Sequence, residues 1–494
     1  MRVLFPFKEI EDENLGAMYL ASMLRLQGHT TELVKAEYKV VKSKLQDNIP
    51  TLLAYSTPSF YADYYLELNQ QIKNDCNTFS IFGGHHPTGC PDIIEREGVD
   101  AVCIGEGEYP LVELVEHLDN GEDITRVKNL WIKINGEIYR NPLRSLIGNL
   151  DILPFPDRSL FTQKSPFFYN RITVMTSRGC DYSCPYCHNR ATDLLYKDVA
   201  RKYRRRSVDN VIKEIKQAQE KIAVEFVLFV DDIFILLPDW LKEFSVKYRK
   251  EVNIPFSCYV RINLITQEIV HYLTRAGCHT VLFGIETGDD GLRKDILRRD
   301  MTSQEIIKKA KLLKSNGIRL IGTNIIGIPG GSLSSDLKTL KLNIQCQVDY
   351  AKVGLLAAYP GTNVGSDSGV SEGNYAKFAD FHPPASIGLL NKLVVSASGH
   401  FKRKLSFLRV GEPAVKEDRQ RRDTANLGKL FPIIVGFPFL YFIVAFLLKL
   451  ARNRFFTYAN FYWEIYSCYF RLYPARFSSC LKGLLKNRLL ISKQ

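Results

Sequence analysis

The sequence predicts two α/β units followed by a basic extension with long apolar runs. Short apolar runs alternate with helix-like stretches along residues 1–148, which is typical of a doubly wound, Rossmann-like parallel sheet. The alternation restarts after residue 166 and supplies six β–α units up to residue 385, enough for a partial (β/α)6 barrel. Residues 386–494 then combine basic and apolar stretches, which favours a mainly helical C-terminal extension.

The N-terminal unit is expected to hold five parallel strands and a terminal hairpin. Residues 14–27 carry apolar side chains at helical spacing, and Gly28 ends that helix. Asn135-Gly136 lies inside the apolar run 131–140, which predicts a β-hairpin with a tight turn. The expected parallel strands are 2–5, 30–34, 51–57, 79–84 and 100–108.

Three loops follow these strands at their carboxyl ends. Ligands of doubly wound sheets bind beyond this edge, so the loops predict a ligand site. The candidate residues are Ser56, Thr57, Gly83, Gly84, His85, Gly105, Glu106 and Gly107.

The boundary between the units is expected at a proline-rich linker over residues 149–165, which contains LPFPDRSLF. Beyond it, the helix-like stretches include 208–222 and 303–317. As in full barrels, the active face should lie at the carboxyl ends of the strands. The expected strands of this second unit are 172–177, 224–232, 255–262, 279–288, 319–330 and 350–362.

A group of three cysteines follows the first strand of the second unit. Cys180, Cys184 and Cys187 are four and three residues apart on a loop kept open by Gly179 and Pro185. Thiolates select zinc, copper(I) or iron–sulfur centres. A zinc site would need a fourth ligand, and three cysteines on a 4Fe–4S cluster would leave one iron open to a substrate. Structural zinc binding and a chance grouping of core cysteines remain the alternatives.

This loop and the strands after it resemble the radical SAM superfamily over residues of about 165–375. The resemblance implies that the three cysteines bind a 4Fe–4S cluster, with Tyr186 as the aromatic residue before the last cysteine. It further implies that the open iron binds S-adenosylmethionine (SAM), which is cleaved to methionine and a deoxyadenosyl radical. The residues implied in SAM binding are Tyr186, Asp231, Asp232, Arg261, Glu286 and Tyr359. Helix-capping acids in loops are the alternative reading of most of them.

The N-terminal unit resembles the cobalamin-binding domain that precedes many radical SAM cores, and the LPFPDR linker matches as well. The resemblance implies that the three glycine-containing loops bind cobalamin. The Asp-x-His-x-x-Gly pattern that supplies a cobalt ligand in classical cobalamin domains does not occur in this sequence. A structural Rossmann-like domain without cobalamin is therefore the alternative.

The positive charge of the protein is concentrated near its C-terminus. The net charge is +13, and residues 401–494 alone carry 18 Lys and Arg against 5 Asp and Glu. Within them, 430–448 is an uncharged apolar run of 19 residues, interrupted by Pro432, Gly436 and Pro438. A basic, apolar segment predicts that a cytoplasmic protein is attached to the inner, anionic face of the membrane. A buried cap on the barrel is the alternative, and nucleic acid is not expected.

The sequence as a whole predicts an enzyme. We expect a cobalamin-dependent radical SAM enzyme that methylates an unactivated carbon of a small or lipid-like substrate and takes its electron from a reductase with flavodoxin or from ferredoxin. A radical SAM cyclase or rearrangement enzyme without methyl transfer is the first alternative. A non-catalytic, membrane-tethered sensor of a cluster or of cobalamin is the second. Methylthiolation of tRNA is not expected, because Cys76, Cys90 and Cys103 do not form a second triad.

Overall fold

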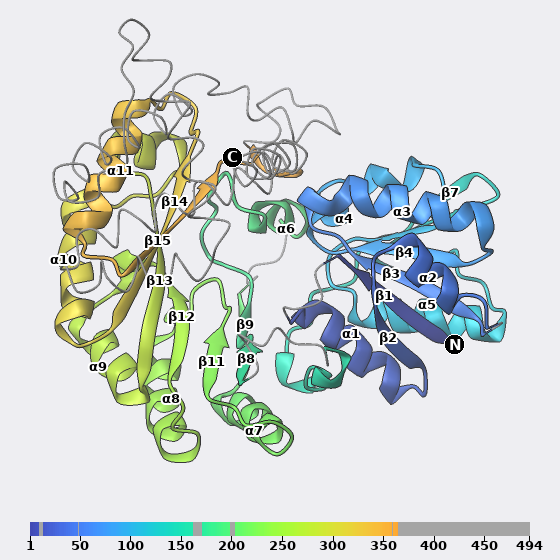
Figure 1. Ribbon diagram of the computed structural model, residues 1–494, viewed down its shortest axis with the longest axis horizontal. Coiled ribbons are helices and arrows are strands. Elements are labelled where there is room, and N and C mark those ends of the chain that lie inside the picture. Colours follow the sequence, from blue (N-terminus) through green and yellow to red (C-terminus); the bar gives the residue numbers. More distant parts are fainter. Residues whose placement is uncertain (9–12, 48, 162–169, 198–202, 358, 364–494) are drawn as a thin grey trace, which may run out of the picture.

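A computed structural model describes residues 1–8, 13–47, 49–161, 170–197, 203–357 and 359–363, which form two α/β bodies side by side (Figure 1). The first body holds the N-terminal sheet, and the second holds the predicted barrel. The predicted extension over 386–494, with its apolar run 430–448, lies outside the described residues.

Within the described residues, seven strands form the N-terminal sheet in the order β2-β1-β3-β4-β5-β6-β7. The first five are parallel, which confirms the predicted doubly wound fold, and the predicted hairpin adds two antiparallel strands beside β5. The sequence did not reveal that the hairpin continues this sheet. The strands are β1 (Arg2–Phe7), β2 (Thr30–Lys35), β3 (Thr51–Ser56), β4 (Phe79–Gly83), β5 (Ala101–Cys103), β6 (Leu130–Ile134) and β7 (Glu137–Arg140).

Helices cover both faces of this sheet. Helices α1 (Leu15–Leu26) and α5 (Glu108–Asn120) pack in one apolar cluster, and α2 (Tyr38–Lys44) and α3 (Ala62–Asp75) pack in the other. The Asn14 side chain caps α1 by accepting a hydrogen bond from Ala17 N. Helix α2 was not predicted, because it is lysine-rich and buries only Val41. The short helix α4 (His85–Gly89) follows β4 directly.

The second sheet holds six parallel strands in the part of the chain that the structure describes, in the order β15-β14-β13-β12-β11-β8. This sheet confirms the predicted partial barrel. The strands are β8 (Arg171–Val174), β11 (Phe226–Phe229), β12 (Phe256–Val260), β13 (Cys278–Glu286), β14 (Arg319–Ile326) and β15 (Tyr350–Leu355). The helices are α6 (Asn189–Leu195), α7 (Val208–Gln219), α8 (Pro238–Glu251), α9 (Gln267–Ala276), α10 (Ser303–Ser315) and α11 (Leu333–Gln345).

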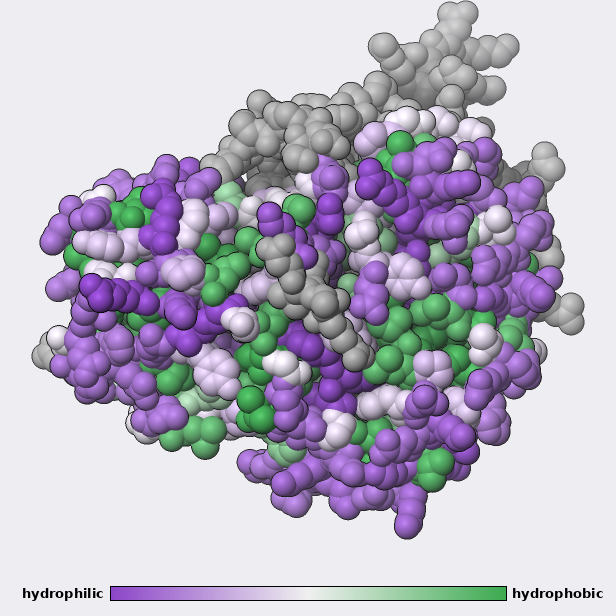
Figure 2. All heavy atoms as spheres, turned by 180° about the vertical axis from the view of Figure 1, so that it is seen from behind, coloured by the Kyte–Doolittle hydropathy of each residue, from purple (hydrophilic) through white to green (hydrophobic). Residues whose placement is uncertain are grey.

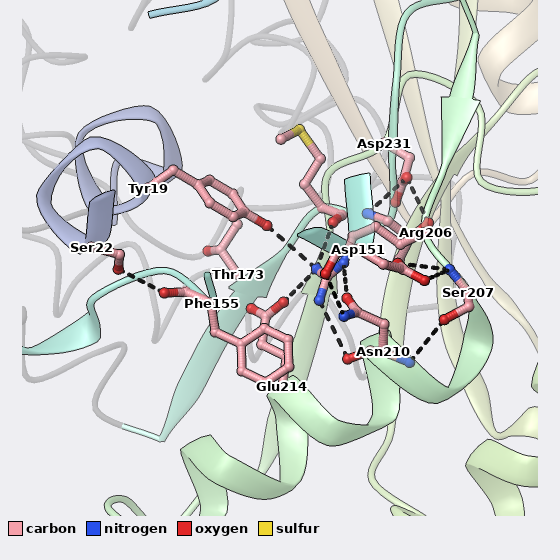
Figure 3. Close-up of polar contacts among 12 residues, drawn as sticks. Tyr19, Ser22, Asp151, Phe155, Thr173, Arg206, Ser207, Asn210, Glu214 and Asp231 are labelled. Atoms are coloured by element: carbon pink, nitrogen blue, oxygen red, sulfur yellow. Dashed lines mark hydrogen bonds and ion pairs between the residues drawn. The ribbon is translucent and has the colours of Figure 1, made fainter. Parts of the chain in front are cut away.

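Two small features join the bodies. A two-stranded antiparallel ribbon pairs β9 (Ser177–Arg178) with β10 (Arg204–Arg205), and the sequence gave no indication of it. The described part of the predicted linker, residues 149–161, is held by both bodies. Ser22 of α1 donates a hydrogen bond to the carbonyl of Phe155, and Asp151 accepts one from Ser207 N ahead of α7 (Figure 3). The segment is therefore a fixed strap, although the boundaries at residues 148, 165 and 385 remain predictions.

Figure 2 shows one face of the molecule, on which hydrophilic residues cover most of the surface and apolar residues lie between them. Over the described ranges, every helix is too short or too polar to cross a bilayer.

Candidate active site at the domain junction

The carboxyl ends of both sheets meet at the junction between the two bodies. His85, which begins α4 after β4, lies against His188 of the cysteine loop, with ring centroids 4.1 Å apart. Gly105 follows β5, and a Cβ atom there would lie 2.6 Å from the hydroxyl of Tyr196, just past α6. Gly89 and Gly361 are similarly close, since a Cβ at Gly361 would lie 3.3 Å from Gly89 Cα. The loops predicted for cobalamin therefore face the loop predicted for the cluster.

The three cysteines lie between β9 and α6. Cys184 is buried, whereas Cys180 and Cys187 are half-buried, and Cys187 N donates to the Cys184 carbonyl at 3.1 Å in a tight turn. Burial raises the pKa of Cys180 to about 11 and that of Cys187 to about 12, so both stay protonated until a metal replaces the proton. Three thiols on one loop are a suitable donor set for an iron–sulfur cluster.

No three described His, Cys, Asp or Glu side chains are already grouped around one metal position.

A buried charged group lies behind the cysteine loop. Glu286 at the end of β13 pairs with Arg299 at 3.0 Å, and Arg299 also donates to the Tyr186 hydroxyl at 3.2 Å. Tyr186 in turn hydrogen-bonds Glu286. Burial raises the pKa of Glu286, and Arg299 opposes that shift. The backbone of Glu286 has φ of 59°, a strained value for a residue with a Cβ atom, and such strain is common at functional sites.

Arg299 was missed by the sequence analysis. The signal that could have found it was Glu286 itself, because a carboxylate at the end of a buried strand requires a cation as its partner. The sequence offers three arginines nearby, and another of them, Arg293, is fully buried against backbone carbonyls. Only the fold distinguishes their partners.

The adjacent acids Asp231 and Asp232 differ in their surroundings. Asp231 is enclosed and accepts hydrogen bonds from Thr176 N at 3.0 Å and Thr176 Oγ1 at 2.7 Å, so it joins the ends of β8 and β11. Asp232 keeps exposed surface, although burial raises its pKa and Asn189 hydrogen-bonds it. Of the two acids, Asp232 is therefore the one that a ligand can reach.

Two further candidates lie beside the cysteine loop. The Arg261 guanidinium stacks 3.8 Å over the Tyr182 ring and lies 3.7 Å from Cys184 Sγ. Its Nε has no hydrogen-bond partner among the described residues. Tyr359, after β15, is half-buried, and burial together with nearby Cys187 raises its pKa. Both side chains are thus brought to the loop from different strands.

Four of the residues predicted for cobalamin pack against one another through their backbone. Thr57 N donates to the Gly83 carbonyl at 2.7 Å, and Thr57 is enclosed. Gly84 has φ of 99°, and a Cβ there would lie 3.1 Å from Thr57 N. Ser56 is half-buried at the end of β3. Gly84 and His85 keep exposed surface at this edge.

His85 is neutral at physiological pH. Burial first, and His188 second, lower the pKa of His85 to about 4. The carboxylate of Asp232 acts on the same pKa in the opposite direction, so the two exposed side chains lie near each other at the junction.

The loop after β5 is used partly for contacts between the bodies. Glu106 pairs with Arg178 at 3.0 Å and with Arg204 at 2.8 Å, and it accepts a hydrogen bond from Ile147 N at 2.8 Å. These arginines hold the pKa of Glu106 below its usual value against the effect of burial. Gly107 is the N-cap residue of α5, and a Cβ there would lie 3.5 Å from Leu20. The role predicted for Glu106 in cobalamin binding remains a prediction.

Comparison with known protein families identifies both bodies. Residues 174–342 match the family model for the radical SAM superfamily, and residues 11–115 match that for the B12 binding domain. The chain therefore carries a B12-binding domain ahead of a radical SAM domain. It is an enzyme, and the cofactors implied by its two domains are a 4Fe–4S cluster, SAM and cobalamin.

Individual relatives agree with this class. An uncharacterised methyltransferase of Pyrococcus horikoshii is 29% identical over 366 residues, which cover 71% of this chain and 77% of the relative. An anaerobic magnesium-protoporphyrin IX monomethyl ester cyclase of Rubrivivax gelatinosus is 22% identical over 69% of this chain and 64% of its own length. The structure of the radical SAM methyltransferase TsrM from Kitasatospora setae, with cobalamin and a 4Fe–4S cluster bound, has a TM-score of 0.59, 18% identity and 74% coverage of each chain. The latter likeness concerns the fold.

Proposed function

We propose that this enzyme methylates an unactivated carbon atom, using SAM and cobalamin. The observation that carries the proposal is the junction itself, where the glycine loops of the B12-binding domain face the three-cysteine loop. Cobalamin would supply the methyl group, and the cluster with SAM would supply the radical chemistry. Both would have to act on the same carbon, so the two cofactors would have to be held at one junction. The methyltransferase names of relatives are a second support.

The residues of this chain would act mainly by positioning. Cys180, Cys184 and Cys187 would hold the cluster, which, when bound, supplies the electron that cleaves SAM to methionine and a deoxyadenosyl radical. Asp232, Arg261, Glu286 and Tyr359 would hold SAM. Tyr186 and Arg299 would keep the Glu286 carboxylate charged and oriented, because an unpaired buried carboxylate would take up a proton.

The proposed cobalamin side of the site is the carboxyl edge of the N-terminal sheet. Gly84 and His85 are its exposed positions, and Gly105 lies against Tyr196 of the second body. Ser56, Thr57, Gly83, Glu106 and Gly107 would shape the loops behind them. Asp231 would act in the same indirect way on the SAM side, since it is enclosed.

The test is mass spectrometry of SAM products after anaerobic reduction of the reconstituted protein with added cobalamin. S-adenosylhomocysteine together with deoxyadenosine supports methyl transfer through cobalt. Deoxyadenosine alone supports the second candidate, a cyclase or rearrangement enzyme, which the cyclase among the relatives favours. Absence of both products from protein with a full cluster contradicts the proposal.

We further propose that the substrate is small or lipid-like, and that the basic extension brings the enzyme to an anionic membrane on the cytoplasmic side. The support is sequence alone: 18 basic and 5 acidic residues over 401–494, around the apolar run 430–448. Flotation with phosphatidylglycerol vesicles tests it, and a chain lacking residues 386–494 is the control. Binding that is equal for both chains, or equal on phosphatidylcholine, contradicts it.

The enzyme also needs an electron donor, which we propose to be flavodoxin with its reductase, or ferredoxin.

A further inference from the structure

The two loops of the proposed site are joined by buried ion pairs. Arg178 of β9 donates to Glu106 Oε1 at 3.0 Å and to Glu108 Oε1 at 2.6 Å, and Arg204 of β10 donates to Glu106 Oε1 at 2.8 Å. We name these four residues the interdomain clamp. Their side chains are between 7% and 17% exposed. Two positive and two negative charges therefore balance one another away from water.

We propose that the interdomain clamp is a positioning device that fixes the B12-binding domain over the cysteine loop. The argument rests on the proposed function and on where the clamp lies in the chain. Arg178 stands two residues before Cys180, and Glu106 stands between Gly105 and Gly107. The clamp thus connects the cluster loop to the β5–α5 loop directly, and any sliding of one body on the other must stretch its ion pairs.

The chemistry of the clamp suits this role better than apolar packing would. Arg178 makes contacts to two carboxylates, and such forked contacts fix orientation as well as distance. Arg204 also donates to the Ile147 carbonyl at 2.9 Å, and Glu106 accepts from Ile147 N. A charged pair in a low-dielectric setting tolerates little displacement, because separated charges would each be left unpaired.

A second network of buried ion pairs, which includes Arg158 of the strap, holds the two bodies in the same arrangement. Arg206 lies 3.4 Å from the Tyr19 hydroxyl of α1 and pairs with Glu214 of α7, which is 2% exposed (Figure 3). Arg158 of the strap pairs with the same Glu214 at 2.5 Å and with Glu13 at 3.2 Å. The Tyr19 ring also lies 5.4 Å below the Arg178 guanidinium. The clamp and the strap therefore share one side of the junction, with Tyr19 between them.

Catalysis explains why such rigidity would be needed. A displacement of reacting groups by about 1 Å can lower a rate by about 100-fold. Loosening the clamp should therefore separate two steps. Reductive cleavage of SAM depends on the core alone, whereas transfer of a methyl group to cobalt depends on both bodies.

The first experiment measures hydrogen exchange of the full-length protein without cofactors. The variants are Glu108→Gln and Arg204→Gln, and the control is Lys314→Met, which removes a partly exposed ion pair to Asp349 within the second body. We expect exchange of peptides covering 104–108 and 175–180 to rise by about tenfold in the clamp variants, because a buried charge loses its partner. The control should leave both peptides unchanged. Unchanged exchange in both clamp variants overturns the proposal.

The second experiment uses SAM and hydroxocobalamin as probes on reconstituted, anaerobically reduced protein, without a further substrate. We expect the clamp variants to keep the cluster and the formation of deoxyadenosine, while methylcobalamin formation falls by about tenfold or more. The double variant Arg178→Gln with Glu108→Gln removes both charges of this ion pair and leaves neither of them unpaired with the other. In the hydrogen-exchange experiment it should therefore exchange more slowly than the single variant Glu108→Gln. Exchange as fast as in the single variant counts against the clamp. Equal loss of both products overturns the positioning role. If the natural protein makes no methylcobalamin while the clamp variants still exchange faster, the proposed function fails and the clamp stands.

Discussion

The two edges that meet at the junction are built from different residues. The B12-binding edge offers glycines, exposed backbone and a neutral histidine, His85. The radical SAM edge offers thiols, Asp232 and the buried pair of Glu286 and Arg299. A large, flat cofactor needs space and backbone contacts, whereas a zwitterionic one needs opposite charges at fixed places. The difference supports the proposal that each edge holds its own cofactor. Three of the predictions change one edge and not the other, and the last changes neither.

The largest effect is expected for Cys187→Ala on the radical SAM edge. With two thiols left, the loop cannot complete the ligand set, so iron content, brown colour and SAM cleavage should all be lost. Chemical analysis of iron and sulfide and chromatography of SAM products measure this. The matched control is Cys76→Ala, which removes a half-buried thiol of the other body and should keep the cluster. A brown, active Cys187→Ala protein would refute the site.

Arg299→Met should give the next largest effect, on stability as well as on SAM binding. It leaves the Glu286 carboxylate buried without its cation, which costs about 3–5 kcal/mol. Urea unfolding measures the loss. The double variant Arg299→Met with Glu286→Gln should recover part of it, because no charge is then left alone. Equal stability of the single variant and the natural protein would contradict the buried-pair assignment.

On the opposite edge, Gly84→Ala should weaken cobalamin binding and leave the cluster intact. The backbone of Gly84 has φ of 99° and ψ of −161°, a region that only glycine adopts readily, so alanine costs about 1–3 kcal/mol there. Equilibrium dialysis with hydroxocobalamin measures binding. Gly148→Ala, whose Cβ would meet nothing within 4 Å, is the control. Loss of the cluster in Gly84→Ala would show that the two edges are not independent.

The smallest effect is expected for Lys314→Met, away from both edges. The pair between Lys314 and Asp349 is partly exposed, with 27% and 39% of the side chains accessible. Pairs of this kind contribute about 0–1 kcal/mol. Urea unfolding should show that the variant loses no more unfolding free energy than this range. A loss as large as that of Arg299→Met would contradict the expected difference between buried and exposed ion pairs.

Sequence patterns were sufficient for the strands of the two main sheets and for the cysteine loop, but not for α2 or for the β9–β10 ribbon. Each predicted strand lies on an observed one, because buried parallel strands are short apolar runs that end at turn residues. The glycine loops and Cys180, Cys184 and Cys187 were found for the same reason, since each follows a strand directly. What the sequence could not supply were partners distant along the chain. Arg299 and the β9–β10 ribbon meet their partners only when the second body folds, and the pairing of Glu106 with Arg178 and Arg204 exists only once the two bodies are docked.

The strap described above limits how far the two halves can be treated as modules. Cutting the chain between them would not separate two finished surfaces, because Arg158 of the strap would lose either Glu13 of the first body or Glu214 of the second, and a buried charge would be left without its partner. Replacing one half by the corresponding half of a relative would break the same ion pairs unless the strap was replaced together with it. In evolution, the B12-binding half, the strap and the radical SAM half of this protein are therefore expected to be inherited together.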